Sequence, residues 1–210
     1  MTETVVGPAY RIETERLVIR CYELSDAPQL NAALRASWDH IGEWLPFARG
    51  DAKPSVADTA GLLRHWRGEF DLDKDYALGI FLADGRTLIG STGLHTRRGP
   101  HAREVGYWVH VDHIGKGYAT ETAAALTKVA FEVDKIHLVE IRVQVGNDGS
   151  AAIPRKLGFV HEATLRQRLS NGDRGFADVQ IWSMLAEEYP DSRSSQAQAR
   201  AYNALGEQLA

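Results

Sequence analysis

The chain has 210 residues, of which 44% are hydrophobic and 25% charged, and its formal net charge is −4 at pH 7. This length fits one domain that can bury a core without disulfides or metals. No apolar run approaches the roughly 20 residues of a membrane helix, and the net negative charge provides no basic field for nucleic acid. The first residues lack the basic and apolar segments of a secretory signal. We therefore expect a cytoplasmic protein with no membrane or nucleic-acid partner.

The first half of the chain alternates strand-like and helix-like segments. Residues 16–22 alternate apolar and polar side chains, and Ser25 and Asp26 then resemble a cap for a helix to about residue 37. Residues 38–54 lack clear periodicity and predict an irregular loop. Residues 55–70 are amphipathic and begin at a weak capping box. Apolar runs at 76–82 and 87–94 flank an Asp-Gly pair, which is typical of a hairpin of two antiparallel strands.

The second half predicts a parallel crossover followed by a hairpin. Residues 104–111 and 138–145 are strand-like and flank a helix-like segment at 119–133, so a right-handed crossover should make the two strands parallel. A short helix at 150–157 should end at Gly158, and residues 159–169 and 177–185 predict the last strands. We expect an N-terminal tail at 1–11, one domain at 12–187, and a loosely docked helix or frayed tail at 188–210.

A glycine-rich turn, HIGKGYATE at 113–121, joins the third predicted strand of the 76–111 region to the helix after it. Glycines let a backbone approach a ligand closely, and successive N–H groups at the positive end of a helix dipole can surround a phosphate. The P-loop pattern and the dinucleotide fingerprint are both absent. The turn alone therefore leaves two readings open, a phosphate site and an ordinary tight turn.

Three sequence blocks, in this order and at this spacing, make the chain resemble the GNAT N-acyltransferase superfamily. They are EVGYWV at 104–109, GKGYATE at 115–121, and Asn147-x-x-Ser150 with KLGF at 156–159. The resemblance covers about residues 12–185, and with GFAD at 175–178 it is most similar to RimJ/RimL-type acetyltransferases of protein N-termini. It implies a mixed α/β (α+β) GNAT fold, in which helices flank a central, mostly antiparallel twisted sheet of six to seven strands with one splayed parallel pair.

The resemblance implies acetyl-CoA, or another acyl-CoA, as the cosubstrate. Pantetheine would pair with backbone groups of the EVGYWV strand, and the glycine turn would hold the diphosphate. Ile114 stands where the family usually has Gln or Arg, but most donors are backbone N–H groups, so we expect binding with a modest loss. The cofactor-binding residues implied in this way are Tyr107, Trp108, Val109, Ile114, Gly115, Lys116, Gly117, Tyr118, Ala119, Thr120, Asn147 and Ser150.

Direct attack of a neutral amine on a thioester needs a base, an oxyanion donor and a proton for the thiolate. The resemblance implies Glu104 as the base, acting through water, and the backbone N–H of Val109 as the oxyanion donor. Many family members use a tyrosine as the acid, but Pro154 occupies that position here, so Ser150 becomes the candidate acid. The structural alternatives are a strand-end carboxylate that balances Arg103, and a helix cap at Ser150.

Three aromatic side chains are candidates for the acceptor site. Trp44 and Phe47 fall in the irregular segment, and His95 follows a predicted strand, where a solvated histidine is the structural alternative. His110 and His113 lie three residues apart, but no carboxylate or cysteine cluster completes a ligand shell, so we expect no metal. The single cysteine, Cys21, is expected in the core.

The function that the sequence favours is acetylation of a primary amine, with a protein N-terminus as the favoured acceptor. Acylation of a small amine, such as an antibiotic or an aminoacyl-nucleotide, is the second enzyme alternative. A non-catalytic acyl-CoA sensor is the third reading, since Ile114 and Pro154 depart from the family pattern. A homodimer is a family-level expectation.

Overall fold

The computed structural model describes residues 8–49, 52–171 and 175–209. In this part of the chain nine strands form one sheet, in the order β7-β8-β6-β5-β4-β3-β2-β1-β9. Every neighbouring pair is antiparallel except β5 and β6, which are parallel. The mixed fold and the parallel crossover are therefore confirmed, whereas the expected number of six to seven strands is too low. Residues 1–7 of the expected N-terminal tail lie outside the described residues.

The strands are β1 (Arg11–Glu13), β2 (Leu17–Cys21), β3 (Tyr76–Leu82), β4 (Leu88–His95), β5 (Ala102–Val109), β6 (Leu138–Gln144), β7 (Val160–Ser170), β8 (Phe176–Leu185) and β9 (Arg200–Tyr202). The α-helices are α1 (Ala27–Gly42), α2 (Val56–Asp71), α3 (Tyr118–Glu132) and α4 (Asp148–Leu157). Short 3₁₀ turns include η1 (Leu24–Asp26), η2 (Pro46–Ala48), η3 (Val111–His113), η5 (Tyr189–Asp191) and η6 (Ser194–Gln196).

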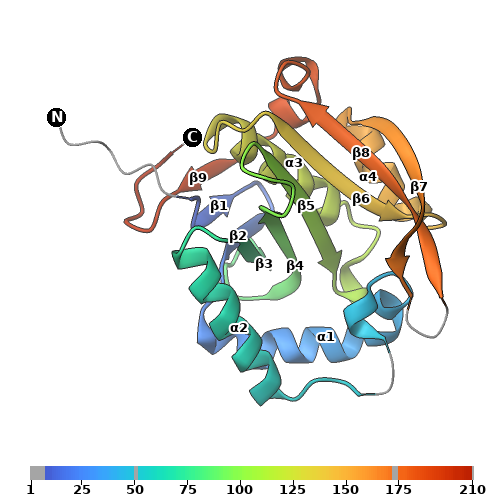
Figure 1. Ribbon diagram of the computed structural model, residues 1–210. Helices are drawn as coiled ribbons and strands as arrows, with labels where there is room; N and C mark the ends of the chain where they lie inside the picture. The colour runs from blue at the N-terminus through green and yellow to red at the C-terminus, as the bar shows by residue number, and fades with distance from the viewer. Residues whose placement is uncertain (1–7, 50–51, 172–174, 210) are drawn as a thin grey trace.

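The helices cover the two faces of the sheet in pairs (Figure 1). Helices α3 and α4 pack with Val105 and Leu94 in the larger apolar core. Helix α1 and Leu63 of α2 pack in a second core on Val18, Phe81 and Leu88. Because side chains alternate across a strand, the neighbours of Val105 and Leu94 along β5 and β4 face the α1–α2 side.

Helix α1 is longer than the sequence pattern predicts, since it continues five residues past residue 37 to Gly42. Trp38 and Ile41 are buried at 4% and 3% exposure and extend the stripe begun by Leu34. Residues 38–42 continue the helix because their apolar side chains are spaced to pack against the second core. The capping box at Ser55 and the left-handed Gly158 at the end of α4 are both confirmed.

The C-terminal segment forms part of the sheet instead of the expected helix or frayed tail. After η5 and η6, strand β9 pairs with β1, and Ile12 stands opposite Ala201. Both side chains are buried, with 0% and 2% exposure. Strands of three residues are too short for alternation to be detected in sequence, which is why β1 and β9 were not predicted.

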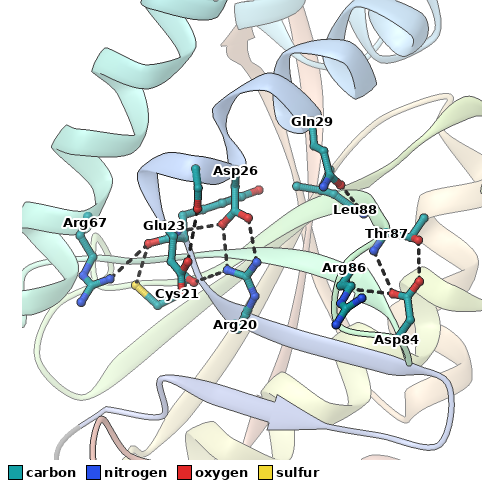
Figure 2. Close-up of polar contacts among 12 residues, drawn as sticks. Arg20, Cys21, Glu23, Asp26, Gln29, Arg67, Asp84, Arg86, Thr87 and Leu88 are labelled. Atoms are coloured by element: carbon teal, nitrogen blue, oxygen red, sulfur yellow. Dashed lines mark hydrogen bonds and ion pairs between the residues drawn. The ribbon is translucent and has the colours of Figure 1, made fainter.

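A charged pair fixes the entry into α1 (Figure 2). Arg20 of β2 donates to both carboxylate oxygens of Asp26, at 2.8 and 2.7 Å. Asp26 also accepts from the backbone N–H of Glu23 at 2.8 Å. The guanidinium lies 3.9 Å from the centroid of the Phe81 ring. This pair therefore ties β2 and the start of α1 to the second core.

Cys21 is buried in the larger core, as expected. Burial raises the pKa of its thiol to about 11. At pH 8 only about one thiol in a thousand would then be ionised, and the thiolate is the reactive form. A disulfide reagent such as dithionitrobenzoate should therefore leave Cys21 unmodified in the folded protein and label it rapidly in urea. Rapid labelling without urea would show that β2 opens locally.

None of the helices in the described ranges is long and apolar enough to cross a membrane.

Candidate active site

A cleft opens where β5 and β6 separate. The two strands pair only over Ala102 to Glu104 on β5, opposite Leu138 to Glu140 on β6. Beyond Glu104, the edge of β5 that faces β6 has no strand partner, while β6 continues to pair with β8. The cleft has a volume of about 1340 Å³ and is lined by this part of β5, by β6, and by the starts of α3 and α4.

The glycine turn stands at the mouth of this cleft and presents free backbone donors. Gly115 and Gly117 have φ angles of +73° and +83°, and Gly117 is the N-cap of α3. This left-handed conformation strongly favours glycine. Within the described residues, no amide from 115 to 120 donates to a protein acceptor. The first turn of α3 can therefore offer several N–H groups to one anion.

Arg16 holds the glycine turn from outside. Its Nη1 donates to the carbonyl of Lys116 at 3.0 Å, its Nε donates to Glu121 at 2.7 Å, and its guanidinium lies 4.7 Å from the Tyr118 ring centroid. The Lys116 ammonium donates to the carbonyl of Asp112 at 2.8 Å and so braces the turn itself. Sequence reasoning missed Arg16, because about 100 residues separate it from its partners and no local pattern marks it.

Ile114 and most of the glycine turn line the cleft. Ile114 is 46% exposed, and Gly115, Gly117, Tyr118, Ala119 and Thr120 line the cleft beside it. The side chain at position 114 makes no polar contact that would replace the Gln or Arg typical of the family. Position 114 therefore adds no side-chain donor to the backbone donors of the turn.

Ser150 and Tyr107 meet across the cleft. The Tyr107 hydroxyl lies 3.2 Å from Oγ of Ser150 and 3.4 Å from its carbonyl. Burial raises the pKa of Tyr107 to about 12, although the hydrogen bond with Ser150 acts to lower it. The phenol is therefore protonated at neutral pH and can donate to Ser150. The N-cap of α4 is Asn147, whose Oδ1 accepts from the Ser150 amide at 3.0 Å, so the alternative that Ser150 caps this helix is wrong.

Glu104 lies in a cluster of charges at the point where the strands separate. It is only 8% exposed, and its carboxylate bonds to Nε of Arg98 at 2.7 Å and to the Nη2 of the same guanidinium. Arg97 and Arg142 lie 3.5 and 3.7 Å away. Glu140, its register partner on β6, binds Arg142 at 2.6 Å. The alternative of an exposed carboxylate paired with Arg103 is wrong, because Arg103 pairs with Asp134.

The face of the sheet toward α1 and α2 contains the predicted acceptor residues. Trp44, Phe47 and His95 all line the cleft, and Phe47 is 59% exposed at its rim. His95 is partly buried, and its Nδ1 lies 2.7 Å from a carboxylate oxygen of Asp75. His95 is therefore held in place, and the alternative of a freely solvated strand-end histidine is wrong.

The chain is similar in sequence and in fold to known acetyltransferases. Residues 16–160 match the family model described as an acetyltransferase (GNAT) domain. The putative ribosomal N-acetyltransferase YdaF of Bacillus subtilis (strain 168) is 32% identical over 179 residues, which is 83% of this chain and 94% of YdaF. Mycobacterium smegmatis RimJ, solved in complex with CoA-disulfide, is 25% identical with a TM-score of 0.78, and the match covers 92% of this chain and 94% of RimJ.

A third match supports the fold alone. RimL, the ribosomal L7/L12 alpha-N-protein acetyltransferase solved with coenzyme A, is 18% identical with a TM-score of 0.73, covering 82% of this chain and 95% of RimL. The family model spans most of the chain, and the splayed strands and the glycine turn lie within the residues that it matches. The chain belongs to the GNAT family of N-acetyltransferases.

Proposed function

We propose that this protein transfers an acetyl group from acetyl-CoA to a primary amine, and that the amine is the N-terminus of a protein. One observation carries the proposal: a single cleft joins the free amides of residues 115–120 to the Ser150–Tyr107 pair, through the opening between β5 and β6. YdaF is named a putative ribosomal N-acetyltransferase, which supports an amine of a ribosomal protein as the acceptor. A cytoplasmic location, expected from the sequence, and a homodimer, expected from the family, stay predictions.

The chain's own groups fit a CoA thioester in this cleft. The N–H groups of 115–120 would bind the diphosphate, because they are unpaired and lie at the positive end of the α3 dipole. The free backbone edge of Tyr107, Trp108 and Val109 would pair with pantetheine as an added strand does. The N–H of Val109 stays the predicted oxyanion donor.

The reaction then needs two proton transfers. The amine nitrogen forms a bond to the acetyl carbon, the carbon–sulfur bond breaks, and sulfur leaves as a thiolate. Ser150 would supply the proton to that thiolate and regain one from the acetylated nitrogen, while the protonated phenol of Tyr107 holds the Ser150 hydroxyl by donating a hydrogen bond to it. Glu104 as the base that removes the ammonium proton stays a prediction from the family, and its ion pairs with arginine occupy much of its carboxylate.

Thiol release from acetyl-CoA tests the proposed function directly. Wild-type protein should release CoA thiol with peptides that carry a free N-terminus, and the same peptides with a blocked N-terminus should give no release above background. Release only with small amines would favour the second enzyme alternative. Tight acetyl-CoA binding without release on any amine would favour the sensor.

Replacing Ser150 with alanine should lower kcat by about 10²-fold, the lower end of what a positioned acid contributes. Tyr107→Phe should have a smaller effect in the same direction, since it removes only the donor to Ser150. Asn147 still caps α4 in the alanine variant, so urea unfolding should show a loss of only about 1 kcal/mol, from the Tyr107–Ser150 hydrogen bond. An unchanged kcat in Ser150→Ala would remove Ser150 from the mechanism. Ser25→Ala, at an exposed position in η1, is the matched control.

A further inference from the structure

The Asp75–His95 pair has the geometry of an oriented imidazole base. Asp75 precedes β3, and its Oδ2 lies 2.7 Å from Nδ1 of His95, while its Oδ1 accepts from the Thr96 amide at 3.0 Å. Burial acts to raise the pKa of Asp75, but the hydrogen bond and charge of His95 hold it below its ordinary value. An ionised carboxylate on Nδ1 fixes the tautomer that leaves the lone pair on Nε2.

Two glycines leave room for the imidazole ring against the sheet. A Cβ atom at position 93 would lie 2.7 Å from Cε1 and Nε2 of His95, so no larger residue leaves room for the ring. A Cβ atom at position 106 would lie 3.5 Å from Nε2. Gly106 stands opposite Gly93 on β5 and belongs to the part of β5 that has no β6 partner. The free ring nitrogen therefore lies over the strand edge where the sheet opens.

This position puts His95 across the opening from Ser150. Tyr107 follows Gly106 on β5, so its side chain points to the opposite face, where it meets Ser150. A thioester between β5 and β6 would have the proton donor on the α3–α4 side and Nε2 of His95 on the α1–α2 side. No described residue bonds to Nε2, whereas arginine holds the Glu104 carboxylate.

We propose that His95, positioned by Asp75, is the catalytic base that takes the proton from the acceptor amine; this rests on the proposed function. The ammonium nitrogen of the acceptor gives one proton to Nε2, and the freed lone pair forms the bond to the acetyl carbon. As the carbon–sulfur bond breaks, Ser150 protonates the leaving thiolate and receives the second nitrogen proton in return, so the products are the amide, the CoA thiol and an imidazolium. Imidazole becomes imidazolium, and the Asp75 carboxylate stabilises its charge. Glu104 then acts as a positioning residue that holds Arg98 beside the start of β5.

Other charges on this face of the cleft can influence the pH profile and must be considered in the test. They come from α1 (His40), α2 (Asp58), the turn after β4 (Arg97 and Arg98), β5 (Glu104) and β6 (Arg142). Variants of His95 and Glu104 must therefore be compared on the same acceptor.

The test is kcat/KM for thiol release between pH 6 and 9, measured on an N-terminal peptide. His95→Gln should lower kcat/KM about 10²-fold at low pH, with unchanged acetyl-CoA affinity. The deficit should shrink as pH passes the α-amine pKa, roughly 7.7–8.0, because the acceptor then loses its proton without help. Asp75→Asn should show the same trend. The asparagine amide would donate to Nδ1 and so favour the tautomer that carries its proton on Nε2, which then has no lone pair to act as a base. His101→Gln, at an exposed nearby turn, should match wild type.

The outcomes separate this inference from the proposed function. If wild type releases thiol and His95→Gln keeps its rate, or loses the same factor at every pH, the base role of His95 is wrong. If Glu104→Gln alone shows a deficit that shrinks with pH, Glu104 is the base. If wild type releases no thiol with any amine, the proposed function fails and the inference falls with it. Nitrogen-15 spectra of the His95 ring should independently show the lone pair on Nε2, and a lone pair on Nδ1 would contradict the geometry.

Discussion

Replacing Asp26 with alanine should destabilise the folded protein by about 3 kcal/mol, the cost of leaving one member of a buried ion pair without its partner. The Arg20 guanidinium would lose both carboxylate oxygens while it stays against the Phe81 ring. The backbone N–H of Glu23 donates to the Asp26 carboxylate, and it would lose this acceptor in the turn that leads into α1. Urea unfolding should show a lower midpoint with an unchanged slope.

Asp84→Ala is the matched control, because Asp84 makes a similar number of hydrogen bonds in an exposed turn with Arg86 and Thr87 (Figure 2). It should cost far less, since solvent can satisfy the groups that it leaves. Equal losses in the two variants would show that burial of the Arg20–Asp26 pair contributes nothing. The double variant Arg20→Met with Asp26→Leu should recover most of the loss, because it removes both charges together.

Replacing Gly117 with valine should weaken acetyl-CoA binding by about 10²-fold. The φ of +83° at this position is strained for a β-branched residue, and such strain costs about 1–3 kcal/mol. If position 117 relaxes to a negative φ, the N–H groups at the start of α3 would no longer point together at the diphosphate. Calorimetric titration with acetyl-CoA measures the affinity.

Gly61→Ala is the control for this change, because Gly61 lies within α2 and a Cβ there meets nothing within 4 Å. It should leave acetyl-CoA affinity unchanged and stabilise the fold slightly, as alanine is the better helix former. Unchanged affinity in a folded Gly117→Val variant would show that the glycine turn does not hold the diphosphate.

The sequence predicts the elements whose side chains have a clear period. Helices α2 and α3 and strands β3 to β6 were predicted within a few residues, since each has a long apolar stripe or a strict alternation. The crossover rule also predicted the parallel pair that opens the cleft. Strands β1 and β9 contain too few residues to show a pattern. The sequence ends α1 too early because residues 38–54 contain glycine, two prolines and two tryptophans without clear periodicity.

The candidate site is predicted less completely, because its side-chain contacts join distant parts of the chain. The glycine turn, Ser150 and Tyr107 were found as positions in sequence blocks, but the Tyr107–Ser150 hydrogen bond spans 43 residues. Arg16 reaches the turn across 100 residues. Asp75 has no sequence signal, since its role depends on the register that brings His95 over Gly93 and Gly106.

A crystal structure of the complex with CoA tests the central claim most directly. We predict that the diphosphate accepts hydrogen bonds from the amides of 115–120, that pantetheine lies along the free edge of β5, and that the sulfur faces Ser150. A diphosphate bound away from this turn, or a sulfur remote from Ser150, would contradict the account.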